Sequence, residues 1–525
     1  MVLSCNSPLK RPLKYQDVLL HARRAVQAPQ SANLRLEPKQ GSQGSTSAAV
    51  SLHSSKPIVL VLGSGWAAHS FIKVIDTEMC DVVVVSPRNH FIFTPMLPSS
   101  AVGTVEYRSL LEPVRISNPH VSYIEASCEV VDMEKKVALC TASVAYESGQ
   151  KPEFEVSWDL LIMAVGEQTA TFGVPGVEEH CFFMKASLTT FACHRSSFLE
   201  LEIQSVTAEV EITDSVKLRR RIVECFELAT LPGASETQKR KAVHFVVVGG
   251  GPTGVEFAGA LEDFLRGDLA RKPGYRDITP YVQVTLLQHA HSVLTMFTEE
   301  LQERALATLR QGGVHVRLGV RVVAVTQDQV ILGVLQVILE GGEHIAYGAC
   351  VWTTGNAAVP LVQAVARQLP QQQDLAKGRN PAATKLAVDP FLRIAGARDA
   401  LALGDCSRLT GAPLPSTAQN APDSESTYLE ERSQVLMLLA QEGGKVEYYG
   451  KPFEFLPLGF MAYLGRDKAV THLEAGKLKF DTAGYLSFLI WRSVYLTKQV
   501  STRNRVLIFW DWIKTRAFGR DLSNF

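Results

Sequence analysis

Two glycine-rich turns, each directly after a run of apolar strand-forming residues, constrain the fold of this chain more than any other feature. The first turn, Gly63-Ser64-Gly65-Trp66-Ala67-Ala68, follows the run Ile58–Leu62. The second turn, Gly249-Gly250-Gly251-Pro252-Thr253-Gly254, follows the run Val243–Val248. A short apolar run that ends in such a turn predicts a buried strand, a tight turn and then a helix.

Each glycine position has a physical role in this pattern. The first glycine permits a sharp turn off the strand, the second lets the backbone approach a pyrophosphate, and the third lets the helix pack close to the sheet. Ala68 takes the third position of the first turn, which the pattern tolerates. A single turn is weak evidence, because glycines also stand at strand ends for steric reasons alone. Two turns in the correct context predict two bound dinucleotides and electron transfer between them.

Composition excludes several other classes of function. The chain has 525 residues, 46% of them hydrophobic and 20% charged, which suits about three globular domains. Its formal net charge is zero, which argues against a nucleic acid partner. None of the nine cysteines forms a C-x-x-C or C-x-x-x-x-C pair. We therefore expect no metal site, no iron–sulfur cluster and no redox-active disulfide.

The two ends of the chain differ in composition from its body. Residues 1–56 contain eight Lys or Arg but only Asp17 and Glu37, with serines interspersed, which predicts an organelle transit peptide. The alternative is a disordered tail without an address. From residue 481 the chain is aromatic and basic, yet neither Tyr485–Leu496 nor Val506–Phe518 reaches the roughly 18 uncharged residues of a spanning helix. Short helices of this kind predict association with a membrane surface, and the alternative is a helical pair docked on its own protein or on a dimer partner.

A set of ordered stretches covers most of residues 57–520. They are VLGSGWAAHSFIKVID, SPRNHFIFTPMLPSSAVGTVEYRSLLEPVR, AVGEQTATFGVPGV, LRRRIVECFELA, HFVVVGGGPTGVEFAGAL, VWTTGN, LALGDC, LPSTAQ, LGFMAYLG and the Trp-rich end. Together they resemble the type II (alternative, non-proton-pumping) NAD(P)H:quinone oxidoreductases, especially the mitochondrial and plastid members.

The resemblance implies an α/β fold with two dinucleotide-binding, Rossmann-like domains of the glutathione reductase-like flavoprotein type, plus a C-terminal membrane-associating helical segment. The implied reaction moves a hydride from NADH or NADPH to non-covalently bound FAD, and then electrons to a membrane quinone, either ubiquinone or plastoquinone. It also implies a peripheral protein of the mitochondrial inner membrane, or alternatively of the plastid thylakoid, and a possible homodimer.

The site residues that we predict on this basis fall into three sets. Those for FAD are Gly63, Gly65, Ala68, Ser86, Arg88, Thr94, Pro95, Gly166, Asp405 and Ala418. Those for NAD(P)H are Gly249, Gly251, Gly254, Glu256, Gln288 and Gly355. The catalytic candidates are Gln419, where the quinone enters, and Glu211, between the nicotinamide and quinone sites.

The predicted domain organisation alternates between the two binding functions. The parts are a transit peptide or disordered segment at 1–56, the first part of the FAD-binding domain at 57–185, an insertion at 186–210, a linking helix at 211–240, the NAD(P)H-binding domain at 241–355, the second part of the FAD-binding domain at 356–430, and a membrane-anchoring or dimerisation region at 431–525.

Three departures from the family pattern carry information. NADH-specific relatives have an acidic residue where this chain has Gln288, and because glutamine does not repel a 2′-phosphate, we expect NADPH to be accepted as well as NADH, or better. Residues 186–210 are either an added surface loop or an artefact of gene prediction, so the match of Glu211 depends on them. Residues 420–425 break the usual first turns of a helix. Because Pro422 can occupy a first-turn position, either the helix begins later or the quinone entrance has a different shape.

Two other functions stay open from the sequence. One is a soluble FAD-dependent NAD(P)H oxidoreductase with a different acceptor. The other is a degenerate flavoprotein that keeps FAD for folding and has no catalytic activity.

Overall fold

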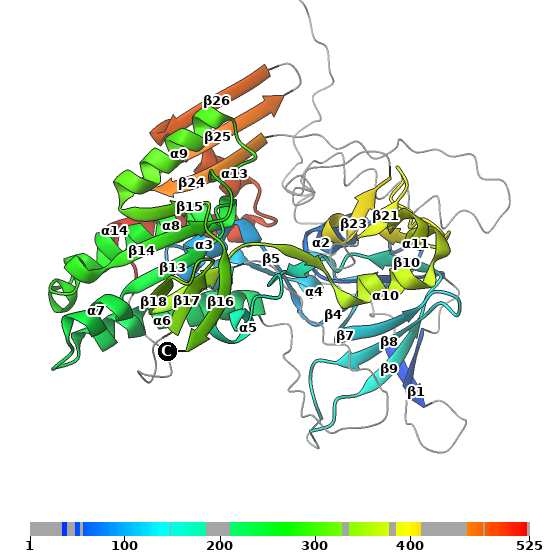
Figure 1. Ribbon diagram of the computed structural model, residues 1–525. Helices are drawn as coiled ribbons and strands as arrows, with labels where there is room; N and C mark the ends of the chain where they lie inside the picture. The colour runs from blue at the N-terminus through cyan, green and yellow to red at the C-terminus, as the bar shows by residue number, and fades with distance from the viewer. Residues whose placement is uncertain are drawn as a thin grey trace, which may run out of the picture.

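The computed structural model describes residues 34–38, 48–52, 56–146, 149–184, 210–327, 335–376, 385–410, 459–475 and 478–521. These residues form two α/β units that lie side by side, with a C-terminal unit against one of them (Figure 1). We call them the first unit, the second unit and the C-terminal unit.

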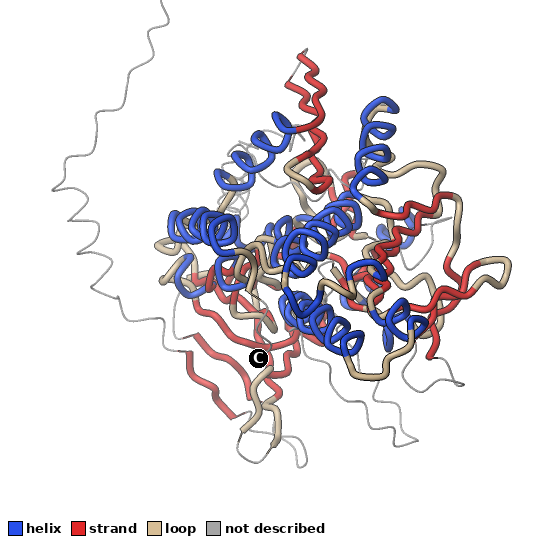
Figure 2. The backbone as a smooth tube through the Cα atoms, turned by 90° about the vertical axis from the view of Figure 1, so that its left-hand side faces the viewer, coloured by secondary structure: helices blue, strands red, loops and turns tan. Residues whose placement is uncertain are grey.

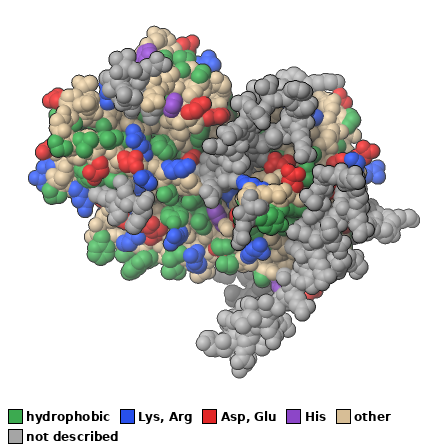
Figure 3. Space-filling model, turned by 90° about the horizontal axis from the view of Figure 1, so that it is seen from below, with side chains coloured by type: hydrophobic (Ala, Val, Ile, Leu, Met, Phe, Trp, Pro, Cys, Tyr) green, Lys and Arg blue, Asp and Glu red, His purple; other side chains and the backbone are tan. Residues whose placement is uncertain are grey.

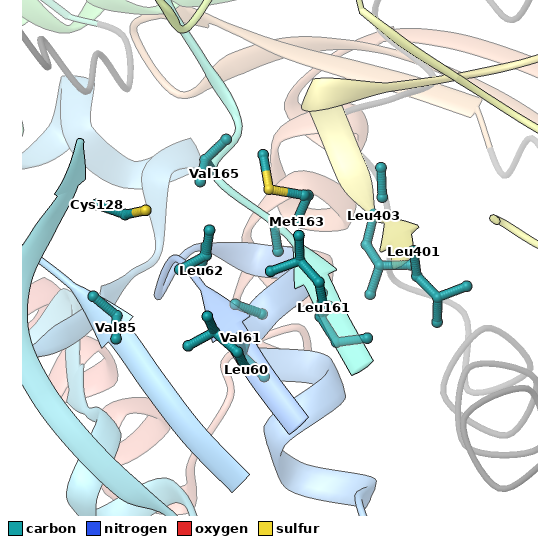
Figure 4. Packing of buried hydrophobic residues seen from close by; sticks show 14 of the residues in the cluster. Leu60, Val61, Leu62, Val85, Cys128, Leu161, Met163, Val165, Leu401 and Leu403 are labelled. Atoms are coloured by element: carbon teal, nitrogen blue, oxygen red, sulfur yellow. The ribbon is translucent and has the colours of Figure 1, made fainter. Parts of the chain in front are cut away.

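The first unit is built on a nine-stranded sheet, in the order β1-β2-β9-β8-β7-β4-β3-β10-β22. Its central strands β4, β3, β10 and β22 are parallel, and nearly all their residues are buried, because the sheet is covered on both faces. Figure 4 shows leucine, valine and methionine side chains of these strands packed together. The bounds are β1 Leu34–Pro38, β2 Ala48–Leu52, β3 Ile58–Leu62, β4 Asp81–Ser86, β7 Ser122–Asp132, β8 Val137–Ala142, β9 Glu153–Ser157, β10 Leu160–Met163 and β22 Ala400–Ala402, with helices α2 Trp66–Val74, α3 Leu97–Ala101, α4 Val114–Ser117, α10 Pro360–Gln368 and α11 Pro370–Ala376.

Strands β1 and β2 lie inside the predicted transit peptide. They pair with each other antiparallel, and β2 adds to β9 in parallel, with Ala48 opposite Phe154. Part of the predicted transit-peptide or disordered segment is thus paired as strand, because the open edge of β9 offers unpaired backbone groups to which a further strand can bond. A targeting role for this segment stays a prediction.

The second unit has a parallel sheet in the order β12-β19-β13-β14-β15. One face of this sheet packs against helices α6, α8 and α9, and the other against a small antiparallel sheet β16-β17-β18. Figure 2 looks onto this side of the molecule, where helices crowd the view. The bounds are β12 Phe182–Phe183, β13 His244–Val248, β14 Gln283–Gln288, β15 Val314–Leu318, β16 Val322–Gln327, β17 Leu335–Leu339, β18 His344–Tyr347 and β19 Ala349–Trp352, with α6 Val210–Thr230, α7 Glu236–Ala242, α8 Pro252–Glu262 and α9 Glu299–Gly312.

The chain passes twice between the two units. The outward pass is strand β11 (Glu167–Thr169) and the return pass is strand β20 (Asn356–Ala358), and these two strands pair antiparallel. The end of β10 and the end of β19 are thereby tied to each other through one short ribbon.

The C-terminal unit consists of an antiparallel sheet and two helices. Its strands β24 (Gly459–Gly465), β25 (Lys468–Ala475) and β26 (Leu478–Gly484) lie at the top of Figure 1, next to α9. Helices α13 (Tyr485–Thr497) and α14 (Thr502–Phe518) follow. In the part of the chain that the structure describes, no helix has the length and apolar character to cross a membrane.

Candidate active site

The two glycine turns have the same backbone geometry. Gly63 and Gly249 have φ angles of +117° and +116°, a region that disfavours any side chain. The Gly63 N–H donates to the carbonyl of Val85, and the Gly249 N–H donates to the carbonyl of Leu287, each at 2.9 Å. The predicted strand–turn–helix units are thus confirmed, and each turn is fastened to the neighbouring parallel strand in the same way.

The third position holds glycine in the second turn and alanine in the first. A Cβ on Gly254 would lie 2.0 Å from the carbonyl oxygen of Gly249, so only glycine fits there. In the first turn the corresponding residue, Ala68, is fully buried in the core of the unit. The alanine that the pattern tolerates thus has its methyl group inside the core of the first unit.

The second position of each turn faces open space. A Cβ built on Gly65 or on Gly251 would meet no atom within 4 Å. Both glycines are the N-cap residues of their helices, α2 and α8, and neither helix has a side chain capping its first N–H groups. An open backbone at an uncapped helix N-terminus is suited to a pyrophosphate, because the N–H groups and the helix dipole both favour negative charge. The residues present at both turns fit a dinucleotide.

The last residue of β4 and the last residue of β14 each bond to the glycine turn beside their strand. In the first unit the hydroxyls of Ser86 and Ser64 are 2.9 Å apart, and Ser86 also accepts from the N–H of Arg88 at 3.3 Å. In the second unit the Gln288 side-chain oxygen accepts from the N–H of Gly250 at 2.9 Å, and its amide donates to Ser292. Both positions therefore shape the turn. Nucleotide contacts of Ser86, Arg88 and Gln288 stay predictions.

The other predicted FAD residues gather at one edge of the first sheet. Because β3, β10 and β22 are parallel, the residues that follow them, Gly63, Gly166 and Asp405, lie at the same carboxyl edge. Ligands bind at this edge in open parallel sheets. Thr94 lies close to the first turn, since its hydroxyl accepts a hydrogen bond from the indole of Trp66 at 3.0 Å, and Pro95 follows it in a short 3₁₀ helix.

Buried charges lie where the chain crosses between the units. Glu167, the first residue of β11, forms an ion pair with Lys385 at 2.8 Å and accepts from Asn356 at 2.9 Å. Just before Asn356, Gly355 has a φ of +85°, and a Cβ there would lie 2.6 Å from the ring of Phe172. The geometry fixes how the second unit connects to the first. A nicotinamide contact of Gly355 stays a prediction.

Glu256 lies in the first half of α8, and its carboxylate is directed at the C-terminal unit. It accepts from the N–H of Tyr463 at 3.1 Å and from the indole of Trp491 at 2.9 Å, and it also hydrogen-bonds to the Tyr495 hydroxyl. Burial raises the pKa of this carboxyl to about 7, and the hydrogen bonds limit the rise. The carboxyl is thus able to release and take up a proton near neutral pH. Contact with the nucleotide stays a prediction.

The partners of Glu256 were not predicted from sequence. Tyr463 belongs to the family stretch LGFMAYLG, and Trp491 and Tyr495 belong to the Trp-rich end, but none of the three has a predicted role. A signal was present, since buried Trp and Tyr side chains need partners for their N–H and O–H groups. Only the fold brings α8 next to β24 and α13, however, because these elements are about 200 residues apart in sequence.

Some predicted residues cannot be placed. Ala418, Gln419 and residues 420–425 lie outside the described residues, as does the predicted insertion except for Val210, which begins α6. The backbone of Glu211 belongs to α6, whereas its side chain is outside the description. The roles of Ala418, Gln419 and Glu211 therefore stay predictions.

Comparison with known proteins places these features in context. Residues 57–424 match the family model for pyridine nucleotide-disulphide oxidoreductases, and residues 458–521 match the model for the NDH2 C-terminal domain. The chain is 36% identical to an internal alternative NAD(P)H-ubiquinone oxidoreductase A1, mitochondrial, of Solanum tuberosum, over 89% of this chain and 88% of the relative. It is 33% identical to an external alternative NADH-ubiquinone oxidoreductase, mitochondrial, of Yarrowia lipolytica, over 89% and 81%.

Solved structures show the same fold. NDH2 of Plasmodium falciparum in complex with NADH matches with a TM-score of 0.71 at 22% identity, over 89% of this chain and all of that one. The sulfide:quinone oxidoreductase of Aquifex aeolicus matches with a TM-score of 0.56 at 16% identity, over 89% and 96%. The predicted pair of dinucleotide-binding domains is confirmed.

Proposed function

The chain belongs to the type II, or alternative, NAD(P)H:quinone oxidoreductases, and we propose that its first glycine turn holds FAD and its second holds the nicotinamide donor. As a member of this family the protein is an FAD-dependent enzyme that passes electrons from NADH or NADPH to a quinone. Bound FAD would supply the redox chemistry, which is hydride acceptance from the nicotinamide and electron transfer to the quinone.

The single observation that carries the assignment of the two sites is the pair of open glycine turns. Gly65 and Gly251 each face space at an uncapped helix N-terminus, and the carboxyl edges of both parallel sheets carry the other predicted contacts. This chain's residues bind and orient two dinucleotides there, and orientation is the main requirement of a hydride transfer between cofactors. The order of the two units, with FAD on the first, follows the family resemblance.

We further propose that Glu256 supplies a proton when the quinone is reduced. Reduction of a quinone to a quinol takes up two electrons and two protons. A carboxyl with a pKa of about 7 is matched to proton transfer at neutral pH. Hydrogen bonds from Trp491 and Tyr463 hold the Glu256 carboxylate at the interface between the second unit and the C-terminal unit.

The two C-terminal helices support a membrane-surface site. One side of α14 is buried on the protein, with Ile508 and Asp511 inside, and Asp511 accepts from the hydroxyl of Ser109 at 2.8 Å. The helices therefore dock on their own protein, as one alternative predicted, while other apolar side chains remain exposed. These are Tyr485, Leu486, Leu489, Val506, Phe509, Trp510, Ile513 and Phe518. We call them the apolar C-terminal face.

Basic residues adjoin the apolar C-terminal face, including exposed Arg503, Arg505 and Arg516 on α14. In the view from below, hydrophobic side chains and Lys or Arg side chains also intermingle over the left-hand part of the molecule, on the side of the second unit (Figure 3). The apolar C-terminal face itself combines exposed apolar side chains with neighbouring arginines. Such a surface suits a headgroup layer, and it would place the enzyme next to a lipid-dissolved quinone. By analogy with the mitochondrial relatives, the proposed location is the inner mitochondrial membrane, with ubiquinone as acceptor. Homodimer formation stays a prediction.

The experiment that tests the function follows the visible absorbance of the flavin. In the full-length protein purified in detergent, NADH or NADPH should bleach the band, and a short-chain ubiquinone should restore it with continued turnover. Bleaching that quinone does not reverse would indicate a different acceptor. A flavin that no nicotinamide bleaches would indicate the non-catalytic alternative.

A further inference from the structure

The second unit contains an open cleft of about 740 Å³ that the proposed reaction does not use. Its floor is the part of strands β14 and β15 that the small sheet β16-β17-β18 leaves uncovered. There the side chains alternate, so that Val284, Val314 and Val316 face the helices whereas Thr285, His315 and Arg317 line the cleft. Helix α7 and strand β18, which lie side by side at the lower left of Figure 1, form the walls.

The side chains of this cleft are predominantly basic. Arg240 and Lys241 reach it from α7, Arg310 from the end of α9, and Arg317 from β15. The one carboxylate in the lining is Glu343, and both its oxygens are taken by Arg317, at 2.6 and 2.7 Å. Within the described residues, Lys241 and Arg310 have no carboxylate in ion-pair distance. We call this site the basic cleft.

Part of the basic cleft is held in place before any ligand arrives. The guanidinium of Arg240 lies over the ring of Tyr281, 5.1 Å from its centre. His244 bonds to the carbonyl of Ala346 through Nδ1 and to the hydroxyl of Thr285 through Nε2, at 2.9 and 2.8 Å. Arg240 is thus ordered by Tyr281, and an ordered cation binds an anion at a lower entropic cost than a freely moving one. Burial lowers the pKa of His244 to about 4, so this side chain is a neutral, hydrogen-bonded part of the floor.

The basic cleft is separate from the nicotinamide site. Strand β14 begins at Gln283 in the cleft and ends at Gln288, which bonds to the second glycine turn. At about 3.3 Å per residue these two positions are roughly 16 Å apart. The cleft therefore lies toward the amino ends of the parallel strands, opposite the edge where the dinucleotide is proposed to bind.

We propose that the basic cleft binds a small soluble polyphosphate, such as a nucleoside diphosphate or triphosphate, independently of the electron donor. Several phosphate groups match several cations that line one open cleft, and guanidinium groups pair with phosphate oxygens in a bidentate manner. The size of the cleft is typical of a small-molecule site. The ring of Tyr281 contributes to the lining by holding the Arg240 guanidinium.

Calorimetric titration of the full-length flavin-loaded protein with inorganic tripolyphosphate, in saturating NAD⁺, tests the proposal. One equivalent should bind per chain, and the double variant Lys241→Gln/Arg310→Gln should weaken binding at least tenfold. The control Arg220→Gln/Arg304→Gln removes two exposed cations outside the cleft and should change the Kd less than twofold. Each variant should keep the melting temperature of the parent, which shows that the loss is not one of folding.

Three results would overturn the proposal. They are the absence of binding, binding that appears only in a parallel titration without NAD⁺, and an equal loss in the control variant. Vesicles of anionic phospholipid form a separate arm. The cleft variant could bind tripolyphosphate like the parent but bind vesicles more weakly. The cleft would then recognise a lipid headgroup, and a soluble polyphosphate would be ruled out. Because NAD⁺ occupies the donor site throughout, these outcomes are independent of the quinone reductase assay.

Discussion

The side-chain oxygen of Gln288 accepts a hydrogen bond from the backbone N–H of Gly250, at 2.9 Å. The residue at the end of β14 thus supports the second glycine turn, and it does so without a negative charge. An acidic residue could accept the same bond but would repel a 2′-phosphate. We therefore expect the choice of donor to depend on the charge of this side chain more than on its shape.

We expect Gln288→Glu to shift the enzyme toward NADH. The kcat/KM for NADPH should fall about tenfold relative to that for NADH, which corresponds to about 1.4 kcal/mol of added repulsion. Steady-state rates with both donors at matched pH measure the ratio. The control Gln311→Glu makes the same chemical change at an exposed position near the end of α9 and should leave the ratio unchanged. An unchanged ratio in Gln288→Glu would contradict the role of charge at this site.

Substitutions at two glycines of the second turn should have different effects, one on dinucleotide binding and the other on the stability of the fold. Gly251→Ala points a methyl group into open space, so the fold should persist while the KM for NADH rises at least about tenfold, because the backbone can no longer approach the pyrophosphate. Gly254→Ala places its methyl group 2.0 Å from the carbonyl of Gly249 and should lower the free energy of unfolding by about 2–5 kcal/mol.

Gly65→Ala is the matched variant in the first turn. It should reduce FAD content and leave the KM for NADH of the remaining holoenzyme unaltered. Thermal unfolding, flavin content and donor kinetics distinguish the three variants. If Gly65→Ala impaired NADH binding and Gly251→Ala released FAD, the two sites would be assigned the wrong way round.

Glu256 should make stability depend on pH. Its pKa is raised to about 7 in the folded protein, from an ordinary value of 4.5. The folded state therefore favours the protonated carboxyl, and that contribution is complete below about pH 4.5 and is lost as the pH rises through about 7. The total change is about 3 kcal/mol. Melting temperatures between pH 5 and 8 should fall in the parent relative to Glu256→Gln.

Glu256→Asp keeps a titrating carboxyl and should retain the pH dependence, although the shorter side chain weakens the bond to Trp491. If Glu256 also supplies a proton to the quinone, kcat should fall in Glu256→Gln while flavin reduction by NADH keeps its rate. Equal slopes of melting temperature against pH in all three proteins would show that this carboxyl does not titrate in the window.

The apolar C-terminal face should determine membrane binding. Trp510 is 61% exposed and Phe509 is 53% exposed. Because burying one aromatic side chain yields about 1.5–3 kcal/mol, Phe509→Ser/Trp510→Ser should lower co-sedimentation with anionic vesicles at least about tenfold. The control Leu228→Ser/Leu231→Ser changes exposed leucines around the end of α6 and should bind like the parent. If the α14 variant bound vesicles as well as the parent, the membrane contact would lie on another part of the protein.

The buried charges of Glu167 and Lys385 should stabilise the fold only as a pair. Lys385→Met leaves a buried carboxylate without its cation, and the free energy of unfolding should fall by about 3–5 kcal/mol. Glu167→Gln in the same chain should recover most of that loss, since the amide can still accept from Asn356. Denaturant unfolding of the single and double variants gives the coupling energy. Additive effects would show that the two charges do not interact.

The sequence alone determined the two strand–turn–helix units, because their signal is local. A sharp turn requires a positive φ at Gly63 and Gly249, and close packing excludes a side chain at Gly254, so the chemistry of the turn is written in consecutive residues. The apolar and basic character of α13 and α14 could also be read directly. The alternatives of docking and membrane contact could not be separated, because one side of α14 is buried and another is exposed.

Only the tertiary structure decided what the isolated polar residues contact. The family resemblance implies a nucleotide contact for Glu256, whereas its carboxylate reaches Tyr463 and Trp491 in a unit far along the chain. Ser86 and Gln288 were read as nucleotide contacts, and each also bonds to the turn next to it. The basic cleft joins residues of α7, α9, β15 and β18. Long-range contacts of this kind leave no periodic signal, since burial and hydrogen bonding depend on which elements pack together.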